Sequence, residues 1–276
     1  MKKRILVAVA YIPPFFIVMF FLPPYMLAAL TSIICAITAY EMLQAIGKNV
    51  NMRVGIYSAF SAALIPIGAY FQVGDLVFMA AALALISLMF IEAVAVFRKR
   101  GEIKFAQILI TLFAGAVIPY MLSSLVSLRI MPEGRLLVLL PVISAFTTDA
   151  GAYFTGVLMG KKKAFPLISP KKTVEGFIGG LVGGTAAVII YGMILTFTTY
   201  HFVIYWALIL YGIIGAFTSE LGDLAFSFIK REYGLKDYGR LFPGHGGMLD
   251  RFDSMIFTAP SIFLLATVIP ALIVRG

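Results

Sequence analysis

The most constraining feature of this sequence is a succession of long apolar runs that fills most of the chain. A transmembrane helix needs about 20 apolar residues, and nine runs approach or exceed that length. We place them at 5–22, 25–46, 54–72, 75–97, 104–128, 136–160, 174–198, 202–229 and 254–274. Only 13% of the residues are charged, against roughly 25% in a soluble domain. The sequence therefore predicts an all-α, polytopic integral membrane protein with about nine transmembrane helices.

The basic residues are distributed very unequally among the segments that join these runs. If the N-terminus is cytosolic, every Lys and Arg except Arg129, Arg135 and Arg275 falls in an inner segment. Cytoplasmic loops of membrane proteins carry such an excess of positive charge. We therefore expect a cytosolic N-terminus, an outer C-terminus and two cytosolic loops, 161–173 and 230–253.

The first run follows Lys2-Lys3-Arg4, as the apolar part of a signal peptide would. We find no convincing small-residue cleavage site, and Pro13-Pro14 and Pro23-Pro24 mark a broken span and its turn. We therefore interpret this run as a membrane span. No soluble domain fits between the runs, so we predict a single membrane domain over residues 1–276.

Carboxylates within the spans are candidate functional groups, because such groups usually face a protein interior or a watery cavity. They are Glu41, Glu92, Asp149, Glu220 and Asp223. Glu41 and Glu92 fall near the predicted cytosolic ends of their spans, so we interpret them as reaching the interface. Asp149 lies deep in 136–160, with Tyr153 one turn further on the same face. Either neighbouring hydroxyls satisfy a buried Asp149, or Asp149 contacts substrate or metal.

Polar residues are densest from the end of the eighth span to the start of the ninth. Asp223, Ser227 and Lys230 recur at i, i+4 and i+7, so one helix face carries a carboxylate, a hydroxyl and a cation. Asp250 and Asp253 share a face at the start of the last span, where helix capping is an alternative role for Asp253. Between them lie Lys236-Asp237-x-Gly239 and Pro243-Gly244-His245-Gly246-Gly247.

This combination of residue types indicates phosphate chemistry. Carboxylates from separate helices can hold Mg²⁺, which commonly bridges substrate phosphates. Lys and Arg neutralise phosphate charge, and glycines expose N–H groups that bind anions. A second basic segment lies on the same predicted face: Lys161-Lys162-Lys163, then Ser169-Pro170-Lys171-Lys172-Thr173-x-Glu175-Gly176. Attraction to anionic lipid is an alternative explanation for Lys161 to Lys163.

Small residues recur every fourth position at the start of the seventh span, as Gly176, Gly180 and Gly184. Such a stripe lets another helix approach closely. It predicts either packing within the subunit or a dimer contact.

The C-terminal segment resembles the phosphatidate cytidylyltransferase (CDP-diacylglycerol synthase) family. The positions that carry the resemblance are Ser227, Lys230-Arg231, Lys236-Asp237, Gly239, Phe242-Pro243, His245-Gly246-Gly247 and Asp250-Arg251-Phe252-Asp253. Asp149-x-Gly-x-Tyr and the Ser-Pro-Lys-Lys-Thr segment are also similar to the family, so motifs cover about residues 145–255. The first half of the chain matches only in hydropathy.

The resemblance implies transfer of CMP from CTP to phosphatidic acid, giving CDP-diacylglycerol and pyrophosphate in a bacterial cytoplasmic (inner) membrane. It also implies Mg²⁺, a second, monovalent cation (K⁺), a homodimer and no nucleic-acid partner. The charge distribution predicts that the active site faces the cytosol. Residues 1–130 would serve the lipid side and assembly, and 136–276 would be catalytic.

The resemblance also assigns roles to individual residues. The metal ligands would be Asp223 and Asp250, and Asp253 would either be a further ligand or orient the others. Lys230 and His245 would be further catalytic residues. The substrate-binding residues would be Asp149, Tyr153, Ser169, Lys171, Lys172, Thr173, Arg231, Lys236, Asp237, Gly246, Gly247 and Arg251. His245 would either assist a proton or brace the glycine loop.

Two other functions remain open from the sequence. Intramembrane carboxylates, glycines and interrupted helices also suit an ion-coupled transporter, although no internal repeat is visible. A related cytidylyltransferase acting on an ether or isoprenoid lipid phosphate would differ only in its lipid groove.

Overall fold

The computed structural model describes residues 13–46, 52–98, 103–242 and 246–274. In these ranges eight helices are long and apolar enough to cross a membrane, so the prediction of an all-α, polytopic membrane protein is confirmed. The eight helices correspond to the second to ninth expected spans. Of the first expected span, residues 13–20 are helical, and 5–12 lie outside the described residues.

The chain divides into two compact units whose segments alternate along the sequence. One unit comprises Met1–Ile130 with Tyr233–Phe252, and the other comprises Met131–Glu232 with Asp253–Gly276. The single membrane domain that we expect over 1–276, with 1–130 and 136–276 in separate roles, stays a prediction.

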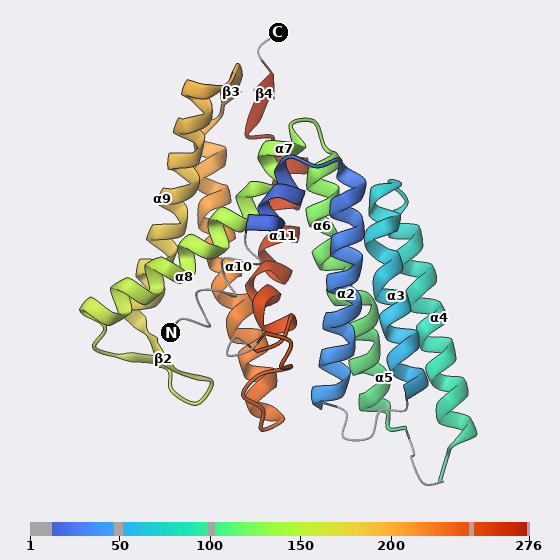
Figure 1. Ribbon diagram of the computed structural model, residues 1–276. Helices are drawn as coiled ribbons and strands as arrows, with labels where there is room; N and C mark the ends of the chain where they lie inside the picture. Colours follow the sequence, from blue (N-terminus) through green and yellow to red (C-terminus); the bar gives the residue numbers. More distant parts are fainter. Residues whose placement is uncertain (1–12, 47–51, 99–102, 243–245, 275–276) are drawn as a thin grey trace. The chain divides into compact units, whose positions relative to one another are not determined.

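The first unit is a group of antiparallel membrane helices (Figure 1). Its elements are α2 (Pro24–Ile46), α3 (Met52–Tyr70), α4 (Gly74–Ala95), α5 (Phe105–Leu112), the π-helical turn η1 (Phe113–Val117) and α6 (Ile118–Ile130). The last three form one continuous span, Phe105–Ile130. The hydroxyl of Ser61 donates a 2.9 Å hydrogen bond to the carbonyl of Gly115, inside the π-turn. A neighbouring helix thus satisfies a backbone group at an irregular point in the span, as an apolar environment requires.

A buried arginine fixes the end of the first described helix. The Arg129 guanidinium donates to the carbonyl of Met19 at 2.9 Å and to that of Leu22 at 3.1 Å. These carbonyls lie at or just beyond the C-terminal end of helical residues 13–20. A cation stabilises a helix C-terminus, where carbonyls lack partners within the helix. Arg129 is one of the few basic residues outside the expected cytosolic segments, and this contact gives it a structural role.

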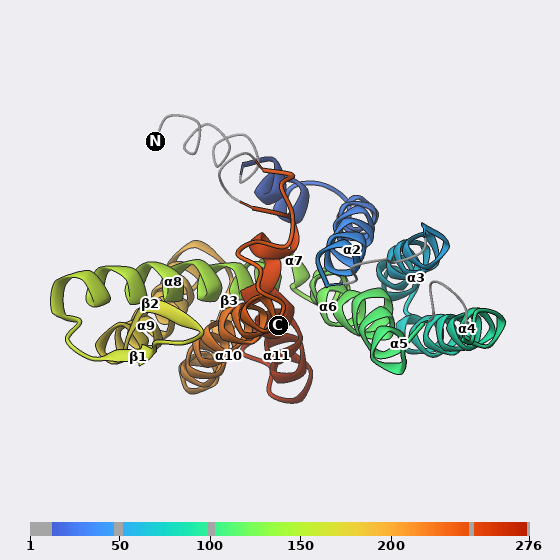
Figure 2. The same ribbon diagram turned by 90° about the horizontal axis from the view of Figure 1, so that it is seen from below.

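The second unit contains the remaining helices and two short strand pairs. Its elements are α7 (Gly134–Leu137), α8 (Leu139–Met159), β1 (Lys163–Phe165), β2 (Ser169–Thr173), α9 (Val174–Thr198), β3 (His201–Val203), α10 (Tyr205–Glu232), the C-terminal part of α11 (Leu249–Val268) and β4 (Leu272–Val274). The strands β1 and β2 form an antiparallel hairpin between α8 and α9 (Figure 2). The loop expected at 161–173 is therefore a folded hairpin.

The glycine stripe of α9 packs against α8 inside the subunit. A β-carbon at Gly176 would lie 2.8 Å from the carbonyl oxygen of Ala152, and one at Gly180 would lie 3.0 Å from that of Thr148. Glycine at these positions therefore allows the two backbones to approach. Of the two interpretations of the stripe, packing within the subunit is confirmed.

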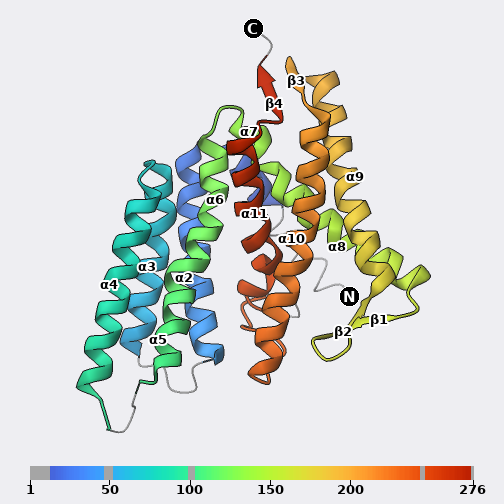
Figure 3. The ribbon, with the colours of Figure 1, turned by 180° about the vertical axis from the view of Figure 1, so that it is seen from behind.

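Helices α10 and α11 lie side by side (Figure 3). A β-carbon at Gly222 would lie 2.6 Å from the carbonyl oxygen of Asp253, so this glycine permits close contact. Further along, Phe226 and Phe257 meet edge to face with centroids 6.4 Å apart. This packing brings the carboxylate-bearing turn of α10 next to Asp253.

The expected boundaries of the last two spans, 202–229 and 254–274, are wrong at several points. Residues 201–203 pair with 272–274 as the antiparallel strands β3 and β4, and α11 extends from Leu249 to Val268. Pro270 cannot continue a helical hydrogen-bond pattern, so the apolar segment after it is free to pair as a strand. Apolar composition alone does not distinguish the two structures.

Candidate active site

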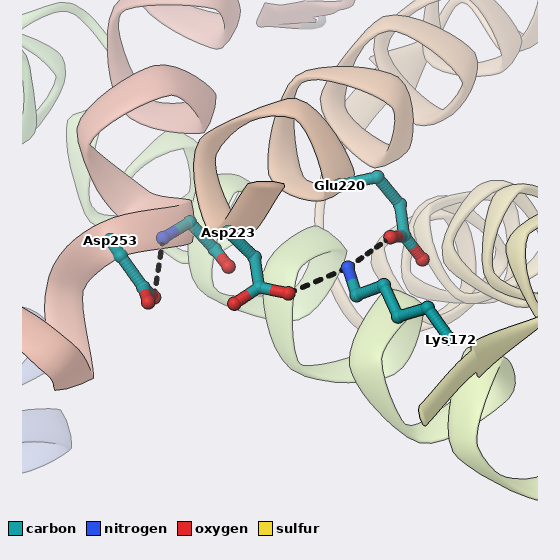
Figure 4. A network of polar contacts seen from close by, with 5 residues as sticks. Lys172, Glu220, Asp223 and Asp253 are labelled. Atoms are coloured by element: carbon teal, nitrogen blue, oxygen red, sulfur yellow. Dashed lines mark hydrogen bonds and ion pairs between the residues drawn. The ribbon is translucent and has the colours of Figure 1, made fainter. Parts of the chain in front are cut away.

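A lysine on the hairpin is held between two carboxylates of α10 (Figure 4). The Lys172 Nζ lies 2.5 Å from Glu220 Oε2 and 2.6 Å from Asp223 Oδ2. Burial lowers the pKa of Lys172, but the nearby Asp223 and Glu220 outweigh burial and raise that pKa above its ordinary value. Lys172 is therefore a firmly protonated cation that two anions hold in place.

Asp253 lies beside Asp223, on the side away from Lys172 (Figure 4). Its side chain is buried, and Oδ1 accepts a 2.8 Å hydrogen bond from the backbone N–H of Ser254. Asp223, Lys230 and Asp149 are all near enough to act on its charge. The second unit thus gathers Asp149, Lys172, Asp223, Lys230 and Asp253 into one polar cluster, which we call the carboxylate–lysine cluster.

Helix capping does not explain Asp253. The helix α11 begins at Leu249, and the acidic residue of its first turn is Asp250. Asp253 therefore lies beyond the turn in which a side chain can bond the unsatisfied N–H groups of a helix start. The capping alternative for this residue is wrong, because the helix starts five residues earlier than the expected 254.

Asp149 and Tyr153 differ in how they relate to the cluster. Asp149 is exposed while the adjacent Thr148 is fully buried, so the interpretation of Asp149 as a buried carboxylate among hydroxyls is wrong. Tyr153 is 66% exposed, and its ring meets Phe154 edge to face. The described contacts of Tyr153 thus give it no link to the cluster.

Asp250 organises the glycine-rich loop of the first unit. Its Oδ2 accepts hydrogen bonds of 2.9 Å from the backbone N–H groups of Tyr238 and Gly247. The loop is also closed by a bond from the Phe242 N–H to the Gly246 carbonyl, and Gly246 adopts a φ of 84°. Only glycine adopts such a φ readily. Asp250 therefore braces the loop with at least one of its oxygens.

Glu41 is the second carboxylate that holds this loop, and sequence reasoning misplaced it. Its Oε2 accepts a 2.9 Å hydrogen bond from the backbone N–H of Leu249, and its side chain is buried. A β-carbon at Gly239 or Gly247 would collide with this carboxylate. The expectation that Glu41 reaches the membrane interface is wrong, because the loop covers it. Its position inside an apolar span was the available signal.

The hairpin is anchored at both ends by side chains near the start of α9. Thr173 Oγ1 accepts a 3.0 Å hydrogen bond from the N–H of Gly176 and so caps the helix. Glu175 Oε2 accepts from the N–H groups of Lys161 and Lys162 at 3.1 and 3.3 Å. These bonds fix the basic segment in front of α9. On the far side of the hairpin, Arg231 Nε donates to the carbonyl of Ile168 at 3.2 Å.

The remaining expected site residues are mostly at the surface. Lys230 and Gly247 are buried, while Ser169 and Gly246 are half-buried. The exposed ones are Lys171, Arg231, Lys236, Asp237 and Arg251. His245 lies outside the described residues, so both roles expected for it stay predictions. Glu220, which the sequence placed among intramembrane carboxylates but not among site residues, contacts Lys172 and so joins the carboxylate–lysine cluster as a sixth member.

The chemistry of the cluster fits Mg²⁺ held jointly by protein and substrate. Carboxylate oxygens are the protein ligands that Mg²⁺ prefers, and it is usually held by one or two of them together with substrate phosphates. Within the described ranges, no group of three or more His, Cys, Asp or Glu is arranged to hold a metal ion. Asp223 and Asp253 lie side by side (Figure 4) and could supply such a partial set.

These features define the class of the protein: a polytopic membrane protein with a partly buried carboxylate–lysine cluster beside a basic hairpin. Comparison with known proteins identifies the family. The pattern of the cytidylyltransferase family matches residues 2–269, so the chain belongs to that family.

Curated relatives carry a more specific name. Proteins named phosphatidate cytidylyltransferase from Staphylococcus saprophyticus and Staphylococcus haemolyticus are 44% and 46% identical over 133 residues. The matched segment is 48% of this chain and 50% of each relative. The chain thus spans about half the length of the curated relatives it matches.

Proposed function

We propose that this chain transfers CMP from CTP to phosphatidic acid, giving CDP-diacylglycerol and pyrophosphate. The observation that carries the proposal is the carboxylate–lysine cluster itself, because charged groups inside an apolar helical unit are costly and mark functional sites. Membership of the cytidylyltransferase family supports nucleotide transfer, and the name of the Staphylococcus relatives supports phosphatidate as the acceptor.

In this proposal the lysines of the cluster bind the triphosphate, and two of its carboxylates bind the metal. Lys172 and Lys230 neutralise phosphate oxygens, and Asp223 and Asp253 hold Mg²⁺. Asp250 is one turn earlier in α11 and is the third proposed ligand. When bound, Mg²⁺ supplies positive charge that polarises the phosphoryl group under attack. A monovalent ion such as K⁺ beside it is part of the same proposal.

The reaction needs little proton transfer from the protein. An oxygen of the phosphatidate monoester forms a bond to the α-phosphorus of CTP. The bond from that phosphorus to the bridging oxygen breaks, and pyrophosphate leaves with the electron pair. Because the monoester is ionised near neutral pH, the residues act mainly by aligning the reactants and by neutralising charge.

The other residues implied by the family resemblance keep their proposed roles. Ser169, Lys171 and Thr173 line the nucleotide side, and Thr173 does so from its capping position at the start of α9. Arg231, Lys236 and Arg251 contact phosphates. Asp149, Tyr153, Asp237, Gly246 and Gly247 complete the substrate site. A homodimer in the bacterial cytoplasmic membrane, with the site facing the cytosol, belongs to the same proposal.

Pyrophosphate release by the purified protein in mixed micelles tests the proposal against its rivals. Release from CTP that requires phosphatidic acid is the expected result. Release only with an ether or isoprenoid lipid phosphate would identify a related cytidylyltransferase. No release with any lipid phosphate, in protein that remains folded, would contradict the enzyme and favour a transporter.

A further inference from the structure

Glu220 is a buried carboxylate that the proposed mechanism does not use. Its side chain is fully buried in α10, and Oε2 contacts the Lys172 ammonium. Its other oxygen, Oε1, is buried and has no hydrogen-bond partner among the residues that the structure describes. A buried acceptor without a partner is destabilising, so this oxygen calls for a functional explanation.

The Lys172 ammonium is shared between two acceptors of unequal environment. Glu220 and Asp223 are three residues apart and so lie on one face of α10. The Asp223 side chain is 28% exposed, whereas that of Glu220 is 0% exposed. An ammonium has three N–H donors, fewer than the acceptor positions that two carboxylates offer. Because Asp223 is the more exposed of the two carboxylates, it is the partner that an external ligand can reach. Glu220 is the inner partner.

The space around Oε1 depends on a glycine of α9. A β-carbon at Gly180 would lie 2.8 Å from Glu220 Oε1, which is closer than real β-carbons come to other atoms. Glycine at this position therefore lets the unpartnered oxygen lie close against the backbone of α9.

We propose that Glu220 is a positioning residue that retains Lys172 when Asp223 exchanges this lysine for a metal ion. The Lys172 ammonium contacts Oδ2 of Asp223, so a metal ion held through that oxygen would compete with the ammonium for it. Glu220 then holds the ammonium through Oε2, and Oε1 accepts a hydrogen bond from the Lys172 N–H that Asp223 has released. Lys172 stays next to the metal, where its charge can meet the triphosphate. The inference rests on the proposed function through the metal-binding role of Asp223.

The binding of Mn²⁺ to the purified protein, followed by electron paramagnetic resonance without nucleotide, tests this exchange. In Glu220→Gln the neutral side chain holds Lys172 less well, so the lysine pairs more tightly with Asp223 and competes with the metal. We expect the Mn²⁺ dissociation constant to rise several-fold. An unchanged constant in folded Glu220→Gln would overturn the inference.

A second variant separates exchange from the simple attraction of a metal to a negative charge. Gly180→Ala keeps every charge but places a β-carbon against Oε1, so we expect it to weaken Mn²⁺ binding as well. Because the same β-carbon would lie 3.0 Å from the Thr148 carbonyl oxygen, thermal unfolding is measured beside Mn²⁺ binding, and only a variant that unfolds near the wild-type temperature is compared. Gly183→Ala is the matched control on the same helix, because its β-carbon would make only ordinary contacts, 3.4 Å from Gly151. Equal Mn²⁺ affinity in folded Gly180→Ala and Gly183→Ala would show that Glu220 acts through its charge alone and would overturn the exchange.

Failure of the inference and failure of the proposed function give different results. If wild type binds Mn²⁺, Asp223→Asn does not, and CDP-diacylglycerol forms, the proposed function stands and the Glu220 variants decide the inference. If wild type and Asp223→Asn bind Mn²⁺ equally, the metal role of Asp223 fails and the exchange fails with it. If neither binds Mn²⁺ without nucleotide, the exchange fails, but a metal held jointly with substrate phosphates is not contradicted.

Discussion

The carboxylate of Glu41 in α2 accepts a 2.9 Å hydrogen bond from the backbone N–H of Leu249, the first residue of α11. The two residues are 208 positions apart in the sequence, and both belong to the first unit. The N–H groups at a helix start have no partner within the helix, and a negative charge there is favourable. Glu41 therefore fixes where α11 begins, next to the loop that Asp250 braces.

Replacement of Glu41 tests this bond. Glu41→Ala leaves the N–H of Leu249 without its acceptor in a buried place, which should lower the free energy of unfolding by about 1–3 kcal/mol. The loop next to Asp250 should also lose order, so CMP transfer should fall. Thermal unfolding in detergent and the rate of CDP-diacylglycerol formation measure both effects.

Glu92→Ala is the matched control for Glu41→Ala. Glu92 pairs with the exposed Arg53 at 3.7 Å, and surface ion pairs contribute only about 0–1 kcal/mol. The unfolding temperature of Glu92→Ala should therefore stay close to that of wild type. Equal loss of stability in the two variants would contradict the role given to Glu41.

Substitutions of Asp223 and Asp250 should distinguish an effect on catalysis alone from an effect on catalysis and loop structure together. Asp223→Asn leaves an oxygen that can still accept from Lys172, so the protein should fold while turnover falls by roughly 100-fold or more. Asp250→Asn should lower turnover as strongly, but with a lower unfolding temperature, because Asp250 also holds the Tyr238 and Gly247 N–H groups. Substantial activity in either folded variant would rule out that residue as a metal ligand.

Thr173 allows its capping role to be distinguished from a contact with nucleotide. Thr173→Val removes the acceptor for the Gly176 N–H and should cost about 0.5–2 kcal/mol of stability. Thr173→Ser keeps the cap and should restore both stability and activity. If Thr173→Val instead keeps its stability and only the KM for CTP rises, the hydroxyl contacts nucleotide and does not act as a cap.

The predicted topology can be tested with single cysteines. The natural Cys35 is buried, and a Cys35→Ala background removes its thiol. A membrane-impermeant maleimide should then label Lys162→Cys, at an exposed position directly before β1, only from the cytosolic side of sealed vesicles. Arg135→Cys, also exposed, should be labelled only from the opposite side. Labelling of both from one side would contradict the charge-based orientation.

Helices were predictable from the sequence where local signals mark both ends. The seventh expected span, 174–198, agrees with α9 because Thr173 is an N-cap residue and the apolar run that follows is uninterrupted. The last span was misplaced, because the apolar residues after Pro270 suit a strand as well as a helix. The β1–β2 hairpin was missed for a similar reason, since Lys-rich segments carry no clear strand pattern.

The residue types of the site were predictable, but their partners were not. Asp223, Asp253 and Lys172 stood out as charged groups in or beside apolar spans, and the structure brings them together. Glu41 and Glu220 showed the same signal, yet their partners, Leu249 and Lys172, lie 208 and 48 positions away. Such contacts depend on tertiary packing, which local sequence patterns do not record.

The central claim, CMP transfer to phosphatidic acid, is tested most directly by the fate of labelled phosphorus. Purified protein is incubated with phosphatidic acid, Mg²⁺ and CTP labelled at either the α- or the γ-phosphate, and the lipid is extracted. The account predicts that the α-label enters the lipid fraction, that the γ-label stays in water as pyrophosphate, and that Asp223→Asn transfers neither. Transfer of the γ-label to lipid, or no transfer of the α-label by folded wild-type protein, would contradict it.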